Sequence, residues 1–251
     1  EAINSIISQL YQNFEVIIVD DCSTDSTPSL LKKYYYGHEK IKIFRNDKNL
    51  GISQSLNYGI SKASGKYIAR MDADDICMPE RLLKQMPLFR KDENILVVSG
   101  AYQRIDQSGK FIDSAVIHPC DAESIKLLLT ICSPVAHPCA TIRKSVFEIV
   151  KYRNVAAEDH DLWIQISKIG KIVNVEDVLL LYRSSCTSLT KKKLVSYFIF
   201  TKYHGLKFLF HLLFKRDKYP VKYIEKEKYR TINWELYDMV ISGLAMFKKI
   251  R

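Results

Sequence analysis

The sequence predicts an α/β fold in which a mostly parallel sheet is flanked by helices. Short runs of β-branched and aromatic residues alternate with amphipathic segments over residues 1–100, and two of these runs end abruptly in aspartates. Alternation of this kind is typical of strands that are connected by covering helices. With 251 residues, of which 47% are hydrophobic, the chain can bury a core of its own.

The predicted elements of the first hundred residues follow one another regularly. Each predicted helix has apolar residues three or four positions apart, as at Ile52, Leu56 and Ile60. The predicted strands are compact and rich in β-branched or aromatic residues. In chain order we expect a helix over 1–12, a strand over 14–19, a helix over 26–35, a strand over 41–44, a helix over 52–63, a strand over 67–71, a helix over 82–89 and a strand over 95–100.

The alternation becomes less regular after residue 101. Gln107, Ser108 and Gly109 predict a hairpin turn, because these residue types favour turn conformations. The last clear helix has Leu162, Ile166 and Ile169 on its inward face. The elements expected here are a helix over 125–131, a strand over 140–142, a helix over 158–169 and a strand over 171–182.

The positive charge concentrates toward the end of the chain. The net charge is +10, and Lys and Arg crowd the sequence from Lys191 onward. We therefore expect a domain over residues 1–190 and a basic, aromatic-rich helical extension over 191–251, with anionic partners such as membrane headgroups or nucleotide sugars. Residues 197–214 either rest on an anionic membrane surface or pack as a helical hairpin on the main domain. Since no recognition motif for nucleic acid is present, we expect no nucleic-acid partner.

The cysteines and the hydropathy of the sequence predict its location. Six cysteines are scattered without a C-x-x-C pair, which fits neither a zinc site nor a disulfide framework. The sequence shows no secretory signal and no apolar run long enough to span a bilayer. We expect a cytoplasmic protein with reduced thiols, and peripheral binding to the inner face of the plasma membrane through the basic extension.

Three acidic motifs lie at the predicted ends of strands or starts of helices. They are VDDCSTD at 19–25, DADD at 72–75 and AEDHDLW at 157–163. Ligands of open α/β sheets bind at the carboxyl ends of strands, and clustered carboxylates suit Mg²⁺ or Mn²⁺. Each motif also has a structural explanation, because acidic residues cap helices and favour their first turns. The local residues leave both explanations open.

Taken together and in order, these motifs resemble the family-2 inverting glycosyltransferases with the GT-A fold. The resemblance extends over most of residues 1–190 and includes QNFEVIIVDDCSTDST, NLGISQSLNYGISKASGKYIARMDADD, MPERLLKQ, HPCATIRKS and AEDHDLW. It implies a Rossmann-like sheet and transfer of a sugar from a nucleotide-sugar, with a UDP-sugar as the expected donor. The implied acceptor is a hydroxyl of a glycan or lipid-linked molecule in the synthesis of bacterial surface polysaccharide or lipid-linked glycan.

The resemblance implies roles for the aspartates. Asp21 corresponds to the residue that binds the uracil ring. Asp72 and Asp74 form the D-x-D pair, with Asp74 as the ligand of Mn²⁺ or Mg²⁺ and Asp72 on the ribose or on the metal through water. Asp159 corresponds to the general base, which takes the proton of the acceptor hydroxyl.

Other residues have supporting roles in this interpretation. Arg70 contacts a phosphate or pairs with one of the acids, and Asp75 assists the D-x-D pair. Glu158 and Trp163 shape the site of the sugar and the acceptor, and His137 lies near the acceptor.

The sequence departs from the family pattern in two places. Family members usually begin with a strand and a nucleotide-gripping loop before the helix expected at 1–12, so we expect this chain to be a fragment of a longer gene product rather than a degenerate enzyme. Many relatives also have a histidine shortly after the positions of Tyr182 and Arg183, whereas residues 184–186 are Ser-Ser-Cys.

Two other functions stay open at this point. An inactive glycosyltransferase-like module that binds a nucleotide or a partner would be consistent with the missing strand. A metal-dependent nucleotidyltransferase also combines an α/β sheet with acidic ligands, but it would normally have a Gly-rich phosphate loop near its start, and none is seen.

Overall fold

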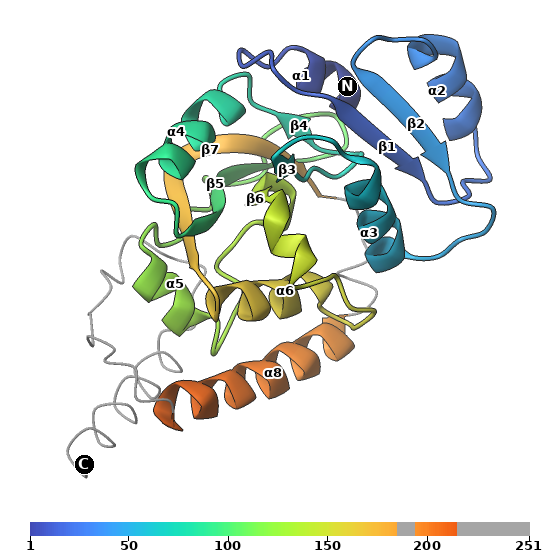
Figure 1. The fold of residues 1–251 in the computed structure, drawn as a ribbon. Helices are drawn as coiled ribbons and strands as arrows, with labels where there is room; N and C mark the ends of the chain where they lie inside the picture. Colours follow the sequence, from blue (N-terminus) through green and yellow to red (C-terminus); the bar gives the residue numbers. More distant parts are fainter. Residues whose placement is uncertain (185–193, 215–251) are drawn as a thin grey trace.

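In the computed structural model, helices and strands alternate through the chain, and residues 1–184 and 194–214 are described (Figure 1). The strands are β1 (Val16–Asp20), β2 (Ile41–Arg45), β3 (Tyr67–Ala69), β4 (Ile76–Cys77), β5 (Ile95–Ile105), β6 (Thr141–Arg143) and β7 (Lys171–Arg183). The α-helices are α1 (Ala2–Ile7), α2 (Thr27–Tyr35), α3 (Ile52–Lys62), α4 (Arg81–Lys91), α5 (Ala122–Leu128), α6 (Glu158–Ser167) and α8 (Leu194–Phe214). Two short 3₁₀ helices, η1 (His137–Cys139) and η2 (Lys144–Glu148), flank β6.

The larger sheet has five strands in the order β3-β6-β5-β7-β4. Only β5 and β7 pair in parallel, whereas β6 is antiparallel to β3 and β5, and β4 is antiparallel to β7. The expected α/β fold with flanking helices is therefore confirmed, but the sheet is mixed rather than mostly parallel. One physical reason is that β4 begins only a few residues after β3 ends, and a connection this short reverses the chain instead of making the crossover that a parallel strand needs.

The smaller sheet pairs β1 with β2 in parallel, with Val16 opposite Ile41. Helix α3 packs closely on β1 because Gly59 has no side chain. A Cβ atom at Gly59 would lie 3.2 Å from Cγ2 of Val19. This close packing fixes the carboxyl end of β1, where the first acidic motif begins.

The main core lies between the larger sheet and the helices α5 and α6. Its completely buried side chains include Val97, Ile142, Leu162 and Trp163, from β5, β6 and α6. Phe208 of α8 joins the same core and is only 2% exposed. Because α6 is buried against the sheet, its first turn is held rigidly beside the strands.

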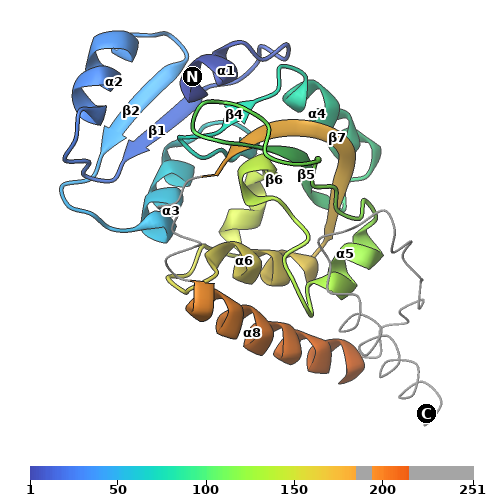
Figure 2. The same ribbon diagram turned by 180° about the vertical axis from the view of Figure 1, so that it is seen from behind.

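Helix α8 lies along α6, on the side of the molecule away from β1 and β2, as Figure 2 shows from behind. This matches the sequence alternative in which the segment packs on the main domain. None of the described helices is long and apolar enough to cross a membrane. The expected boundary at residue 190 lies outside the described residues, as does most of the expected extension beyond residue 214.

Candidate active site

The acidic motif at residues 72–75 forms the turn between β3 and β4. One carboxylate oxygen from each of Asp72, Asp74 and Asp75 lies within 4.8 Å of the other two. Asp75 is completely buried: its Oδ1 accepts a hydrogen bond from the backbone N–H of Arg183 at 2.9 Å, while its buried Oδ2 has no partner among the described residues. An unpartnered buried oxygen is costly, and a hard divalent cation would satisfy it. The donor set therefore fits Mg²⁺ or Mn²⁺.

Two carboxyl groups of this turn, those of the buried Asp75 and the exposed Asp74, have raised pKa values. Burial, together with the neighbouring carboxylates of Asp72 and Asp74, raises the pKa of Asp75 to about 7, although the hydrogen bond from the Arg183 N–H lowers it. Burial and the charge of Asp72 also raise the pKa of Asp74. Both carboxylates are therefore unfavourable as bare anions, and a cation bound between them would displace protons.

Arg70, directly after β3, is buried and pairs with Asp72. Its Nη1 donates to Oδ2 of Asp72 at 2.7 Å, and its Nη2 forms an ion pair with Oδ1. Of the two roles that the sequence leaves open for Arg70, the structure shows the pairing with an acid. This bidentate contact holds the Asp72 carboxylate in one orientation.

Asp159 lies in the first turn of α6 and belongs to the same charged group. Burial raises the pKa of Asp159, the positive charge of Arg70 lowers it, and the negative charge of Asp72 raises it. The charges of two acidic motifs that are far apart in the sequence therefore act on one another. A carboxylate with a raised pKa suits proton transfer near neutral pH. Glu158 precedes Asp159 in this turn, and the charge of Glu158 acts on Tyr152, as that of Asp159 does.

His137 and Trp163 form an aromatic cluster with Tyr152 behind this charged group. Nε2 of His137 lies 2.8 Å from the Tyr152 hydroxyl, and the His137 and Trp163 rings meet edge to face, with centroids 5.8 Å apart. Burial, helped by the charge of Arg70, lowers the pKa of His137 well below its usual value. Trp163 is 0% exposed and packs against His137, and its role in shaping the sugar and acceptor site stays a prediction.

Asp21 lies at the carboxyl end of β1 and is engaged with the loop before α3. Its Oδ1 accepts hydrogen bonds from the Asn46 side chain and the Leu50 N–H, and its Oδ2 from the Gly51 N–H, each at 2.8 Å. Cys22, the next residue, has a φ of +60°, a left-handed conformation that is rare for a side chain of this kind. The structure thus gives Asp21 a role in shaping the turn, and its contact with a nucleoside stays a prediction.

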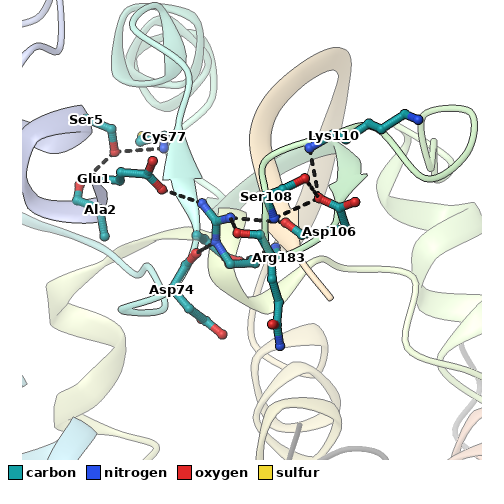
Figure 3. Close-up of polar contacts among 11 residues, drawn as sticks. Glu1, Ala2, Ser5, Asp74, Cys77, Asp106, Ser108, Lys110 and Arg183 are labelled. Carbon is teal, nitrogen blue, oxygen red and sulfur yellow. Dashed lines mark hydrogen bonds and ion pairs between the residues drawn. The ribbon is translucent and has the colours of Figure 1, made fainter. Parts of the chain in front are cut away.

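Arg183, at the end of β7, contributes to the site and was not predicted (Figure 3). Its guanidinium donates to the Asp74 carbonyl at 2.8 Å, and its side chain is only 13% exposed. Arg81 of α4 was also missed, although it lies in the motif MPERLLKQ, and it donates to the Arg70 carbonyl at 2.7 Å. Its place in the motif MPERLLKQ is the signal that could have identified Arg81, but the sequence shows neither its burial nor its partners.

Several known proteins are similar to this chain. Residues 1–150 match the model of the family described as glycosyl transferase family 2. Relatives include an uncharacterized glycosyltransferase of Haemophilus influenzae, 32% identical over 73% of this chain and 60% of that protein, and the putative glycosyltransferase EpsE of Bacillus subtilis, 36% identical over 68% of this chain and 62% of that protein. The O-antigen biosynthesis glycosyltransferase WbnJ of Escherichia coli is 31% identical over 83% of this chain and 82% of that protein.

The fold is an α/β fold, and these relatives are named as glycosyltransferases. Since the family model matches more than half of the chain, the chain belongs to glycosyl transferase family 2. The crystal structure of TarS 1-349 of Staphylococcus aureus in complex with UDP-GlcNAc has a TM-score of 0.65 at 17% identity and covers 97% of this chain and 66% of that chain, which confirms the GT-A fold. The chain spans about 60% of the length of the first two relatives.

Proposed function

We propose that this protein transfers a sugar from a nucleotide-sugar, with a UDP-sugar as the donor, to an acceptor hydroxyl with inversion at the anomeric carbon. The observation that carries this proposal is the charged group of Asp159, Arg70 and Asp72, which joins a candidate base to a candidate metal site. A solved structure of TarS with the same fold is named as a complex with UDP-GlcNAc, which supports this class of donor.

Asp74 and Asp72 are the proposed ligands of a divalent cation, Mn²⁺ or Mg²⁺, and the partnerless Oδ2 of Asp75 is a third oxygen available to it. When bound, such a cation supplies positive charge that stabilises a departing diphosphate. Arg70 orients Asp72, and its buried guanidinium adds positive charge on the same side of the site. Arg70 is also the residue that we propose to contact a donor phosphate.

Asp159 is the proposed general base. As the acceptor oxygen bonds to the anomeric carbon, the carbon–oxygen bond to the diphosphate breaks and its electron pair leaves with the diphosphate. The carboxylate of Asp159 takes the proton from the acceptor hydroxyl, and its raised pKa suits this transfer. A single displacement of this kind inverts the anomeric carbon and needs no covalent enzyme intermediate.

The remaining proposed contacts surround this centre. Asp21 binds the base of the nucleoside, and Glu158 and His137 contact the acceptor. The relative WbnJ is named as an O-antigen biosynthesis glycosyltransferase, which supports a surface polysaccharide or a lipid-linked glycan as the acceptor class. We further propose a cytoplasmic location at the inner membrane face, with α8 as the part that meets anionic lipid.

The test combines binding with turnover. We expect UDP to bind in calorimetry more tightly with Mn²⁺ than without it, and we expect Asp159→Asn to bind UDP and Mn²⁺ like the wild type while its transfer rate falls at least about a hundredfold. Full transfer by Asp159→Asn would show that the base is wrong. Binding of UDP by a wild-type protein that releases no UDP from any UDP-sugar would instead favour the inactive module.

A further inference from the structure

The side chain of Arg183 holds the acidic turn from the side of β7, although no motif singled it out. We propose that Arg183 is a positioning residue that fixes residues 74 and 75 for the divalent cation. This inference rests on the metal site of the proposed function and concerns how that site is kept in shape.

Arg183 donates hydrogen bonds to two consecutive residues of the acidic turn. Its Nε donates to the carbonyl oxygen of Asp74 at 2.8 Å, and its backbone N–H donates to Oδ1 of Asp75 at 2.9 Å. The second contact leaves the other Asp75 oxygen, the buried and partnerless Oδ2, as the one available to a ligand. The two contacts together set both the path of the turn and the orientation of Asp75.

The other side of the guanidinium is anchored in the hairpin that follows β5 (Figure 3). Nη1 donates to the carbonyl oxygens of Asp106 and Gln107, each at 3.1 Å. This hairpin is itself well ordered, because the Asp106 carboxylate accepts hydrogen bonds from the N–H and hydroxyl groups of Ser108 and from the Lys110 N–H. Arg183 therefore links the acidic turn to this hairpin through hydrogen bonds.

The fork geometry of arginine is needed for this arrangement. The three nitrogens of the guanidinium have different partners: Nε contacts the acidic turn, Nη1 the hairpin, and Nη2 the Glu1 carboxylate at 2.6 Å. A lysine carries the same charge but offers a single nitrogen, so it cannot span these partners. The variant Arg183→Lys therefore keeps the positive charge but loses the hydrogen bonds that hold the turn, so it distinguishes the effect of the charge from the effect of positioning.

The positive charge of Arg183, taken alone, would weaken the binding of a cation, whereas its positioning of the turn would strengthen it. Its positive charge lowers the pKa of Asp74, and by the same Coulomb interaction it disfavours a cation nearby. If Arg183 acted only as a charge, its removal would tighten cation binding. If it acts by position, its removal weakens binding, because residues that orient metal ligands through hydrogen bonds typically contribute a factor of about 10–100 to metal affinity.

The test is a calorimetric titration of Mn²⁺ into the wild type, Arg183→Met, Arg183→Lys and the control Arg104→Met. Arg104 lies on the neighbouring strand β5, and its guanidinium pairs with Asp113 rather than with the acidic turn. We expect Mn²⁺ affinity to fall at least about tenfold in Arg183→Met and also to fall in Arg183→Lys, and to be unchanged in Arg104→Met. Thermal melting in the same buffer checks that each variant is folded. If Arg183→Met does not fold, the Mn²⁺ affinity of Arg183→Lys tests the positioning role.

The outcomes separate the two levels of the proposal. Equal or tighter Mn²⁺ binding in folded Arg183→Met would overturn the positioning role. Unchanged affinity in Arg183→Lys, with weaker binding in Arg183→Met, would also overturn it, because the fork would then be dispensable. A wild type that binds no Mn²⁺ would overturn the metal site itself, and this inference with it.

Discussion

At the scale of single residues, Arg81 shows how a buried charge can be satisfied without a carboxylate. It is 2% exposed, and its guanidinium donates to the carbonyl oxygens of Arg70, Pro138 and Ala140 at 2.7, 3.1 and 3.2 Å. These bonds join the residue that follows β3 to the segment around η1. The buried guanidinium of Arg81 thus fixes the main chain that enters the acidic turn, and this support does not depend on a bound ligand.

His160 predicts how stability depends on pH. It is 0% exposed, its Nε2 lies 3.0 Å from the Leu129 carbonyl, and burial lowers its pKa to about 4. The charge of His204 on α8 also lowers this pKa, while that of Asp161 raises it. An unfolded histidine titrates near about 6.5, so between these values the unfolded chain binds more protons, and stability falls as the pH drops from about 6.5 toward 4.

We expect this histidine to contribute a loss of about 2–3 kcal/mol over that range. Urea unfolding at pH 7.5 and pH 4.5 measures it, and His160→Gln should reduce the difference between the two values. The matched control is His38→Gln, a partly exposed histidine that should leave the difference as it is. An equal pH difference in the wild type and His160→Gln would contradict the prediction.

At the scale of helices and strands, the periodicity of the sequence identified the elements but not all of their ends. Helix α1 ends at Ile7 although apolar spacing continues to Leu10, because the Gln9 side chain turns inward and donates to the Met78 carbonyl at 2.7 Å. Strand β5 continues to Ile105, beyond the predicted end at residue 100, because it pairs with β7 along its length. Both ends depend on partners distant in sequence, which local patterns do not contain.

The same limit applies to the site. The three acidic motifs were recognisable because their residue types and positions at strand ends or helix starts are local features. The assembly of β3, α6 and β7 determines three other features of the site. These are the interaction of Asp159 with Arg70, the inward position of Trp163 and the hydrogen bonds of Arg183 to the acidic turn. Sequence therefore predicted the acidic residues of the candidate site but not Arg183, and the fold was needed to show which of these charges interact.

Helix α8 allows a prediction about close packing. A Cβ atom at Gly205 would lie 2.3 Å from the Thr130 carbonyl oxygen, which is too close for α8 to keep its place. Gly205→Ala should therefore lower the free energy of unfolding by about 1–3 kcal/mol, even though alanine favours helices by about 1 kcal/mol. Thermal melting would show this as a lower Tm.

A second helical glycine provides the comparison. At Gly59 in α3, an added Cβ would meet two side chains, Val19 at 3.2 Å and Ile17 at 3.9 Å, and a side chain can move more easily than a carbonyl. Gly59→Ala should destabilise less than Gly205→Ala. A higher Tm for Gly205→Ala than for the wild type would mean that helix propensity outweighs this contact.

At the scale of the whole molecule, the positive charge and an exposed apolar surface occur in the same part of the chain. Residues 1–190 contain 23 Lys and Arg and 23 Asp and Glu, so the whole net charge of +10 comes from residues 191–251. Within this part, α8 turns Thr201, Gly205 and Phe208 inward, while Ile199, Tyr203 and Leu206 are 62%, 54% and 53% exposed. Apolar side chains on a basic helix are typical of segments that bind anionic membrane surfaces.

We therefore predict binding to anionic vesicles through this outer face of α8. In flotation with phosphatidylglycerol vesicles, the wild type should bind at low salt and lose affinity as salt rises, because the attraction is partly electrostatic. Replacing Ile199, Tyr203 and Leu206 together by serine should weaken binding by at least about tenfold, since each removes apolar surface that would enter the lipid.

The control replaces three exposed apolar residues outside α8, namely Tyr36, Phe111 and Ile149, by serine. These are at least as exposed as the three on α8 but lie in the charge-balanced part of the chain, so this variant should bind vesicles like the wild type. If both triple variants lost binding equally, or if the wild type bound neutral phosphatidylcholine vesicles as well as anionic ones, the outer face of α8 would not be a surface for anionic lipid. The charge and the apolar face must act together, because neither alone distinguishes a membrane surface from an ordinary solvated helix.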